Sequence, residues 1–261
     1  MVNPLAMHIA FAGSGNVATH LAVGLHKAGC DIVAVASRSI DNARALADKV
    51  GAAATDDVSA LPDDVDFIII SASDASVAGI SDRLPVIDGV VVHTSGSVPV
   101  VELSRRHARA GVLYPLQTFS KDVPVDIAAV PFFTEGTDDD TLAAIDILAR
   151  RLSQNVYHAD SSHRRYLHVA GVLSSNFTVY LLEQCRRVLA RGGYPLEVVR
   201  PLVGATLEKA FAVGPHDAMT GPARRGDLAV IEAQYNLAPD DLKPVYRLVS
   251  EQIYKTYNQD K

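Results

Sequence analysis

Short apolar runs alternate with amphipathic segments over the first half of the chain. Residues 67–70 and 90–92 are continuously apolar, which is typical of parallel strands buried on both faces. The runs that predict β-strands are 9–12, 32–36, 67–71, 90–94, 111–113 and 131–134. The segments that predict helices are 17–28, 41–49, 77–84, 100–109 and 141–152. The alternation predicts an α/β fold with a doubly wound, Rossmann-type parallel sheet.

The pattern changes near Val156, and no strand is predicted from Ser161 to Tyr257. Residues 161–190 carry apolar positions at helical spacing, and Gly192 and Gly193 end this predicted helix. Further helices are predicted at 196–212, 227–235 and 242–257. We therefore expect two domains, a Rossmann-type dinucleotide-binding domain at 1–157 and an all-α domain at 158–261.

A glycine-rich turn follows the first predicted strand and opens the first predicted helix. Its sequence, Gly-Ser-Gly-Asn-Val-Ala, matches the dinucleotide-binding pattern Gly-x-Gly-x-x-Gly/Ala. Gly13 permits the tight turn, and Gly15 lets a pyrophosphate approach the backbone, where free N–H groups and the helix dipole favour its charge. A plain glycine-rich turn is the alternative interpretation. The candidate cofactor-binding residues here are Gly13, Ser14, Gly15, Asn16 and Val17.

The end of the second predicted strand indicates which dinucleotide binds. NAD-binding proteins place an Asp or Glu there to accept hydrogen bonds from the adenine ribose. This chain has Ser37, Arg38 and Ser39, and an arginine between two hydroxyl groups suits the 2′-phosphate of NADP. We expect NADP as the cofactor, with a solvated loop arginine as the alternative.

Composition and charge narrow the class of protein. The 261 residues include 48% hydrophobic and 21% charged positions, enough for a substantial core, and the net charge of −6 disfavours a nucleic-acid-binding protein. Cys30 and Cys185 match no metal-ligand spacing, so no metal site is expected, and reduced thiols fit a cytoplasmic protein. Neither a membrane-spanning segment nor a secretion signal is predicted.

Polar residues follow the two most apolar predicted strands. Ligands of open α/β sheets bind beyond the carboxyl ends of the strands, so these residues are expected near the nicotinamide half of the dinucleotide. For Ser71 and Ser73, helix capping is as good an interpretation as contact with the ligand. His93 could titrate near neutral pH, or it could be a buried, hydrogen-bonded histidine. The candidate cofactor-binding residues are Ser71, Ala72, Ser73, Thr94, Ser95 and Gly96.

A polar set stands out on the long predicted helix. Ser175 and Asn176 follow His168 by two helical turns, so all three can share one face. Polar groups on an otherwise apolar helix are costly to bury without partners, which favours a position beside a cleft. His168, Ser175 and Asn176 are therefore the candidate catalytic residues, with His168 as proton donor or acceptor. A structural histidine bonded across a domain interface is the alternative.

Four further motifs resemble a known family over nearly the whole chain. They are Val-His-Thr-Ser-Gly-Ser at 92–97, Tyr-Pro-Leu-Gln-Thr-Phe at 114–119, Leu167-His168 with Ser175-Asn176-Phe177, and Thr-Gly-Pro-Ala-Arg-Arg-Gly-Asp at 220–227. Together they resemble bacterial proteins that join a Rossmann-like NADP-binding domain to a helical domain of unknown function. That family is similar to the pyrroline-5-carboxylate reductases and the 6-phosphogluconate dehydrogenase group. Many members have His where this chain has Tyr114, so an imidazole role at that position is in doubt.

The resemblance implies a helical domain that binds substrate and forms a homodimer, with the substrate between the domains. The candidate substrate-binding residues are Gln117, Arg225 and Asp227, although Arg225 and Asp227 could equally form a structural ion pair. The sequence favours an NADP-dependent oxidoreductase acting on a small C=O or C=N substrate, or the corresponding alcohol or amine. A non-catalytic NADP-binding redox sensor or assembly protein is the alternative.

Overall fold

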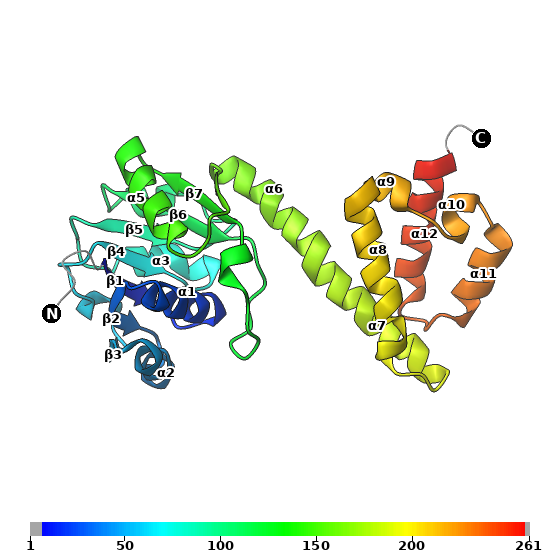
Figure 1. Cartoon of the computed structure of the whole chain (residues 1–261), viewed down its shortest axis with the longest axis horizontal. Coiled ribbons are helices and arrows are strands. Elements are labelled where there is room, and N and C mark those ends of the chain that lie inside the picture. The colour runs from blue at the N-terminus through cyan, green and yellow to red at the C-terminus, as the bar shows by residue number, and fades with distance from the viewer. Residues whose placement is uncertain (1–6, 259–261) are drawn as a thin grey trace. The chain divides into compact units, whose positions relative to one another are not determined.

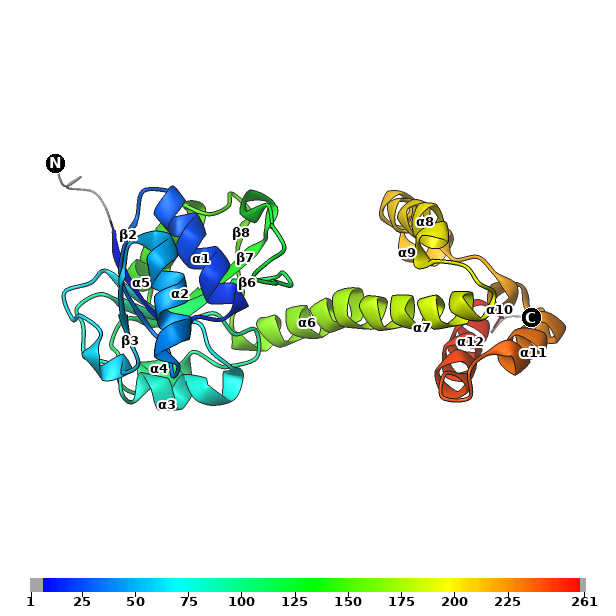
Figure 2. The same cartoon turned by 90° about the horizontal axis from the view of Figure 1, so that it is seen from below.

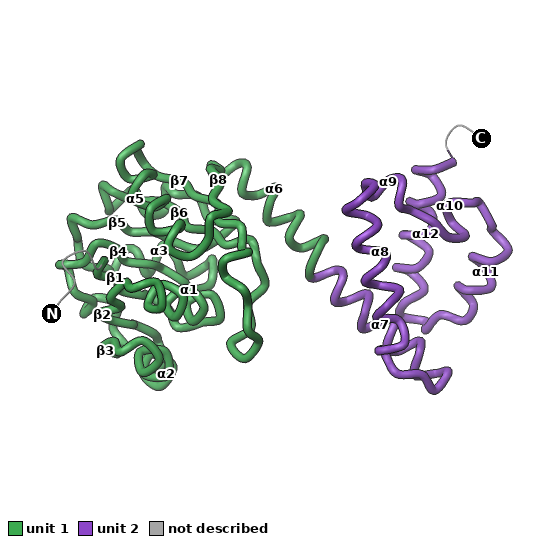
Figure 3. The backbone as a smooth tube through the Cα atoms, viewed as in Figure 1, with its two compact units in different colours: residues 1–175 green, residues 176–261 purple. Residues whose placement is uncertain are grey.

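The computed structural model describes residues 7–258. The chain divides into two compact units, residues 1–175 and 176–261 (Figure 3). The division falls inside a continuous helical stretch rather than at 157/158, where the sequence pattern changes.

The first unit is built on one 8-stranded sheet with the order β3-β2-β1-β4-β5-β6-β7-β8. Neighbouring strands are parallel except for the antiparallel pair β6 and β7. The chain reverses its direction of travel across the sheet between β1 and β4, which is the switch point where doubly wound folds bind ligands. The strands are β1 (His8–Ala12), β2 (Asp31–Ala36), β3 (Ala53–Thr55), β4 (Phe67–Ile70), β5 (Val90–His93), β6 (Ala110–Pro115), β7 (Phe132–Gly136) and β8 (Val156–His158).

Helices cover both faces of this sheet (Figures 1 and 2). Alternate residues of β1 point to opposite faces, so Phe11 joins the core under α1, α2 and α5, whereas Ala10 joins a second core with Leu84 and Leu103. The helices are α1 (Asn16–Lys27), α2 (Ile40–Val50), α3 (Val77–Ser81), α4 (Val101–Ser104) and α5 (Asp139–Arg150), with the 3₁₀ turns η1 (Val58–Ala60), η2 (Asp74–Ser76) and η3 (Ile127–Ala129). The predicted fold class is thus confirmed for this unit.

The rest of the described chain is helical, as predicted. The long predicted helix is interrupted by a π-helical turn, η4 (Val172–Asn176), between α6 (Ser161–Gly171) and α7 (Phe177–Arg191). The remaining elements are η5 (Leu196–Val199), α8 (Arg200–Val213), α9 (Pro215–Ala218), α10 (Pro222–Arg225), α11 (Leu228–Leu237) and α12 (Lys243–Asn258). Among residues 7–258, no helix combines the length and apolar character needed to cross a bilayer.

Candidate dinucleotide site

A pocket of about 770 Å³ lies in the first unit, at the carboxyl ends of β1, β2, β4, β5 and β6. It therefore occupies the position in which doubly wound sheets bind ligands. The sequence-predicted residues that line it are Gly13, Ser14, Gly15, Asn16, Val17, Ser37, Arg38, Ser71, Ala72, Ser73, Thr94, Ser95, Gly96, Gln117 and His168. Lining residues that the sequence reasoning did not select include Asn42, Asp56, Asp74, Arg83, Tyr114 and Lys121.

The glycine-rich turn leaves room for an anion at the start of α1. Gly13 has φ +125°, and a Cβ atom there would lie 2.0 Å from the carbonyl oxygen of Ser71, so only glycine fits. Beside Gly15 the space is open, with no atom within 4 Å of the Cβ position. No side chain caps α1, and its first turn holds no acidic residue. The first N–H groups of α1 are therefore available to a dinucleotide diphosphate.

At the end of β2, the pocket presents a positive charge. Arg38 is exposed, lines the pocket and forms no ion pair with any residue that the structure describes. The Ser14 hydroxyl donates to the Ser37 hydroxyl at 2.9 Å, which joins the glycine-rich turn to this end of β2. Ser39 does not line the pocket; its hydroxyl accepts a hydrogen bond from the N–H of Asn42 and caps α2. The arginine thus lies where the sequence pattern expects the 2′-phosphate.

The turns after β4 and β5 form the other part of the pocket. The Thr94 hydroxyl donates to the Ser71 hydroxyl at 3.4 Å. The Ser95 hydroxyl accepts from the N–H groups of Ser97 and Val98, both at 3.1 Å, so it holds the shape of its own turn. The Ser97 hydroxyl in turn donates to the carboxylate of Asp74 and links the two turns.

His93 is a buried structural histidine. Its side chain has no exposed surface, and its Nδ1 accepts a hydrogen bond from the N–H of Ser95 at 3.2 Å. Burial, helped by the positive charge of Arg164, lowers the pKa of His93 to about 3. The ring is therefore neutral at physiological pH, and it supports the turn rather than facing the pocket.

Tyr114 and Gly96 fit against each other at the pocket wall. A Cβ atom at residue 96 would lie 2.7 Å from Cζ of Tyr114, so the glycine makes room for the phenol ring. Burial, and the nearby carboxylate of Asp74, raise the pKa of Tyr114 above its usual value. The phenol consequently keeps its proton at neutral pH.

His168 lines the pocket from α6, and Arg164, about one turn earlier, fixes the start of that helix. Arg164 is fully buried and forms an ion pair with Glu135 of β7. It also donates to the carbonyl oxygen of Val98 at 2.8 Å and to that of Ala159 at 3.2 Å. These contacts tie α6 to the turn that follows β5.

The remaining candidate residues belong to other segments of the chain. Ser175 and Asn176 belong to the π-helical turn, and neither is among the residues that line this pocket. Arg225 ends α10 and is exposed. The Asp227 carboxylate caps α11 by accepting from the N–H of Val230 at 3.2 Å, and among the described residues no ion pair joins it to Arg225. Gln117 lines the pocket and accepts from the N–H of Thr118 at 2.8 Å.

The sheet order, the glycine-rich turn and the open start of α1 define a Rossmann-type dinucleotide-binding protein with an added helical domain. Residues 8–92 match the family described as NADP oxidoreductase, coenzyme F420-dependent, and residues 130–253 match the domain of unknown function DUF2520. The chain belongs to the family that joins these two domains. The resemblance found in its motifs is thereby confirmed.

Several solved structures share the fold of this chain. A candidate NADP oxidoreductase from Bacteroides fragilis is 35% identical, with a TM-score of 0.89 over 96% of this chain and 98% of that chain. A reductive aminase from Aspergillus terreus, in complex with NADPH and ethyl levulinate, is 15% identical with a TM-score of 0.73, covering 97% and 95%. A pyrroline-5-carboxylate reductase from Coxiella burnetii is 17% identical with a TM-score of 0.58, covering 97% and 98%. No curated protein matches the chain in sequence.

Proposed function

We propose that this protein is an NADP-dependent oxidoreductase that acts on a small C=N or C=O substrate, or on the corresponding amine or alcohol. The observation that carries the proposal is a single pocket that brings together the glycine-rich turn, Arg38 and His168. The reductive aminase and the pyrroline-5-carboxylate reductase among the similar structures support C=N chemistry. The free thiols of Cys30 and Cys185 support a cytoplasmic location.

In this proposal, different residues of the chain bind the cofactor, transfer the proton and orient the substrate. Residues 13–17 and Arg38 bind the dinucleotide, which supplies the hydride when bound. Reduction of C=N also requires a proton on nitrogen, and His168 is the group that we assign to hold and transfer it. Gln117 offers an amide to orient the substrate. Ser175 and Asn176 remain proposed catalytic residues, and Arg225 and Asp227 remain proposed substrate contacts.

The direct test is a panel of imines, keto acids and ketones incubated with NADPH, followed through the absorbance of the reduced nicotinamide. Hydroxy acids and amines with NADP⁺ test the reverse direction. We expect consumption of NADPH with at least one C=N or C=O compound. Tight NADPH binding with no turnover across the panel would instead favour a redox sensor.

The cofactor preference is expected to depend on Arg38. Replacing Arg38 by Asp removes a charge-assisted contact to the 2′-phosphate, so NADPH binding should weaken by about 1.5–3 kcal/mol, roughly 10- to 150-fold. NADH affinity should change little. Arg44→Asp is the matched control, because Arg44 is exposed on α2 and does not line the pocket. An unchanged NADPH-to-NADH affinity ratio in Arg38→Asp, measured by calorimetry, contradicts the assignment.

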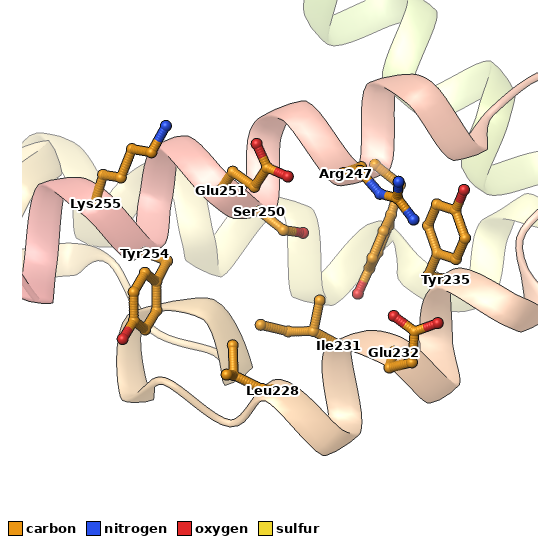
Figure 4. Close-up of a pocket in the computed structure, with 10 residues that line it drawn as sticks. Leu228, Ile231, Glu232, Tyr235, Arg247, Ser250, Glu251, Tyr254 and Lys255 are labelled. Carbon is orange, nitrogen blue, oxygen red and sulfur yellow. The ribbon is translucent and has the colours of Figure 1, made fainter.

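We also propose that the helical unit forms a homodimer. Within the described chain, α8, α11 and α12 bury none of their residues. A groove of about 350 Å³ lies between α11 and α12. Figure 4 shows Leu228 and Ile231 on one side of it and Tyr254 on the other. An exposed apolar surface of this extent is typical of an interface. Large apolar side chains that are at least 48% exposed in this unit include Phe177, Val179, Leu181, Leu202, Phe211 and Leu228.

A second copy of the chain covers this surface best, because identical apolar faces pair across a two-fold axis. Light scattering at micromolar concentration should therefore give twice the 27.9 kDa chain mass. Replacing exposed Phe211 by Glu should shift the protein toward the monomer, and Val86→Glu in the first unit should not. A monomeric mass for the unmodified protein rejects the proposal.

A further inference from the structure

The segment after β6 is held against the start of α1. The amide Nδ2 of Asn16 donates to the carbonyl oxygen of Phe119 at 2.9 Å. One turn further along α1, Nε2 of His20 lies 3.0 Å from the carbonyl oxygen of Ser120 and donates to it. The His20 and Phe119 rings also contact each other in a tilted arrangement, with their centroids 4.9 Å apart and their planes inclined by 34°. Two backbone carbonyls and a buried ring thus fix residues 117–121 beside the pocket.

This attachment places Lys121 in the pocket wall together with Gly15 and Asn16. The first turn of α1 offers N–H groups but contains no basic side chain. A dinucleotide diphosphate carries two negative charges, so the helix N-terminus alone does not neutralise it. A cation supplied from another part of the chain would complete the site.

The pocket contains Lys and Arg side chains at three positions, and two of them have other roles. Arg38 lies at the end of β2, where the 2′-phosphate is expected. Arg83 donates to the carboxylate of Asp57 at 2.8 Å and is held in that ion pair. Lys121 forms no ion pair with any residue between 7 and 258. It is therefore the cation of this pocket that remains available to the diphosphate.

We propose that Lys121 is the cationic ligand of the cofactor diphosphate and that α1, through His20 and Asn16, positions it. The inference rests on the proposed function only in requiring that a dinucleotide binds in this pocket. It assigns two different roles to two cations: Arg38 distinguishes NADP from NAD, whereas Lys121 binds the part that both share. No step of the chemistry passes through Lys121.

Calorimetric titration with NADPH and with NADH separates these roles. Lys121→Ala should weaken the binding of both dinucleotides by a similar factor, about tenfold, because both lose the same charge-assisted contact. Its NADPH-to-NADH affinity ratio should stay that of the unmodified protein, whereas Arg38→Ala should lower that ratio. Lys27→Ala is the matched control, since Lys27 is exposed at the other end of α1 and the change in net charge is the same. Salt should weaken binding less steeply in Lys121→Ala than in the control.

A double-mutant cycle tests the positioning role of His20. His20 does not line the pocket, so His20→Ala should weaken dinucleotide binding only by releasing the segment that carries Lys121. In the Lys121→Ala background, the same change should then have little further effect. Additive losses would show that His20 does not position Lys121. Thermal unfolding of each variant verifies that the fold is retained.

Three results would overturn the proposal. If Lys121→Ala binds both dinucleotides with unchanged affinity, Lys121 does not contact the cofactor diphosphate. A loss confined to NADPH assigns Lys121 to the 2′-phosphate instead. If the unmodified protein binds neither dinucleotide, the proposed function fails together with this inference, and that outcome is distinct from the first two.

Discussion

Replacing Arg164 by alanine is expected to lower the free energy of unfolding by about 3–5 kcal/mol, because it leaves one member of a buried ion pair without its partner. The Arg164 side chain has 0% exposure and that of Glu135 has 15%, so water cannot fully solvate the Glu135 carboxylate once the guanidinium is removed. The change also removes hydrogen bonds to the carbonyl oxygens of Val98 and Ala159. Urea unfolding at neutral pH measures the effect.

An exposed ion pair provides the control for this prediction. Arg186 and Glu183 on α7 are 53% and 49% exposed, so Arg186→Ala should lower the free energy of unfolding far less than Arg164→Ala does. If Arg164→Ala costs no more than this control, the buried pair does not stabilise the start of α6. Combining Arg164→Met with Glu135→Gln removes both charges together and should recover part of the loss.

The strands at the centre of the sheet could be predicted because burial on both faces leaves a strong signal in the sequence. Every residue of β4 and β5 is buried, and the two strands contain the continuous apolar runs 67–70 and 90–92. The strands β3 and β8 were not predicted. Each has three residues, too few for an alternating pattern to be recognised. The predicted helices at 77–84 and 100–109 are likewise shorter in the structure, at Val77–Ser81 and Val101–Ser104.

The part of the pocket built by local chain geometry was predictable, whereas the part built by distant segments was not. Gly13 and Gly15 lie in one short motif, and their spacing predicts the turn without information from distant segments. Lys121 lies in a connecting segment without periodicity, and only its attachment to α1 brings it to the pocket. Tyr114 could have been selected, since it lies near the end of the buried strand β6 and inside a recognised motif. Nothing in the sequence distinguishes buried Arg164 from its exposed neighbour Arg165.

Hydroxyl residues illustrate a second limit of sequence reasoning. Serine at a strand end suits a ligand contact and a backbone hydrogen bond equally well. The structure uses Ser39 to cap α2 and Ser95 to shape its own turn. Ser37 pairs instead with Ser14, and both Ser37 and Ser95 line the pocket. Only the three-dimensional positions of the neighbouring N–H groups decide between these uses.

Replacing His168 by alanine is expected to slow the chemical step by about 10²–10⁴-fold, because a positioned acid–base group is lost. His168 lines the pocket from α6, whereas the glycine-rich turn and Arg38, at the ends of β1 and β2, bind the cofactor in our proposal. NADPH affinity should therefore stay nearly unchanged, so that kcat falls while cofactor binding does not. Single-turnover measurements with an active compound from the NADPH panel separate the two quantities.

His163 offers a control on the same helix. It bonds to the Asp160 carboxylate at 2.9 Å, is 73% exposed and does not line the pocket. His163→Ala should leave the rate of the chemical step unchanged, whereas His168→Gln, which keeps hydrogen bonding without a titratable proton, should be nearly as slow as His168→Ala. Equal rates for His168→Ala and the unmodified protein would remove His168 from the mechanism. Tyr114 would then be the next group to test, because its protonated phenol faces the same pocket.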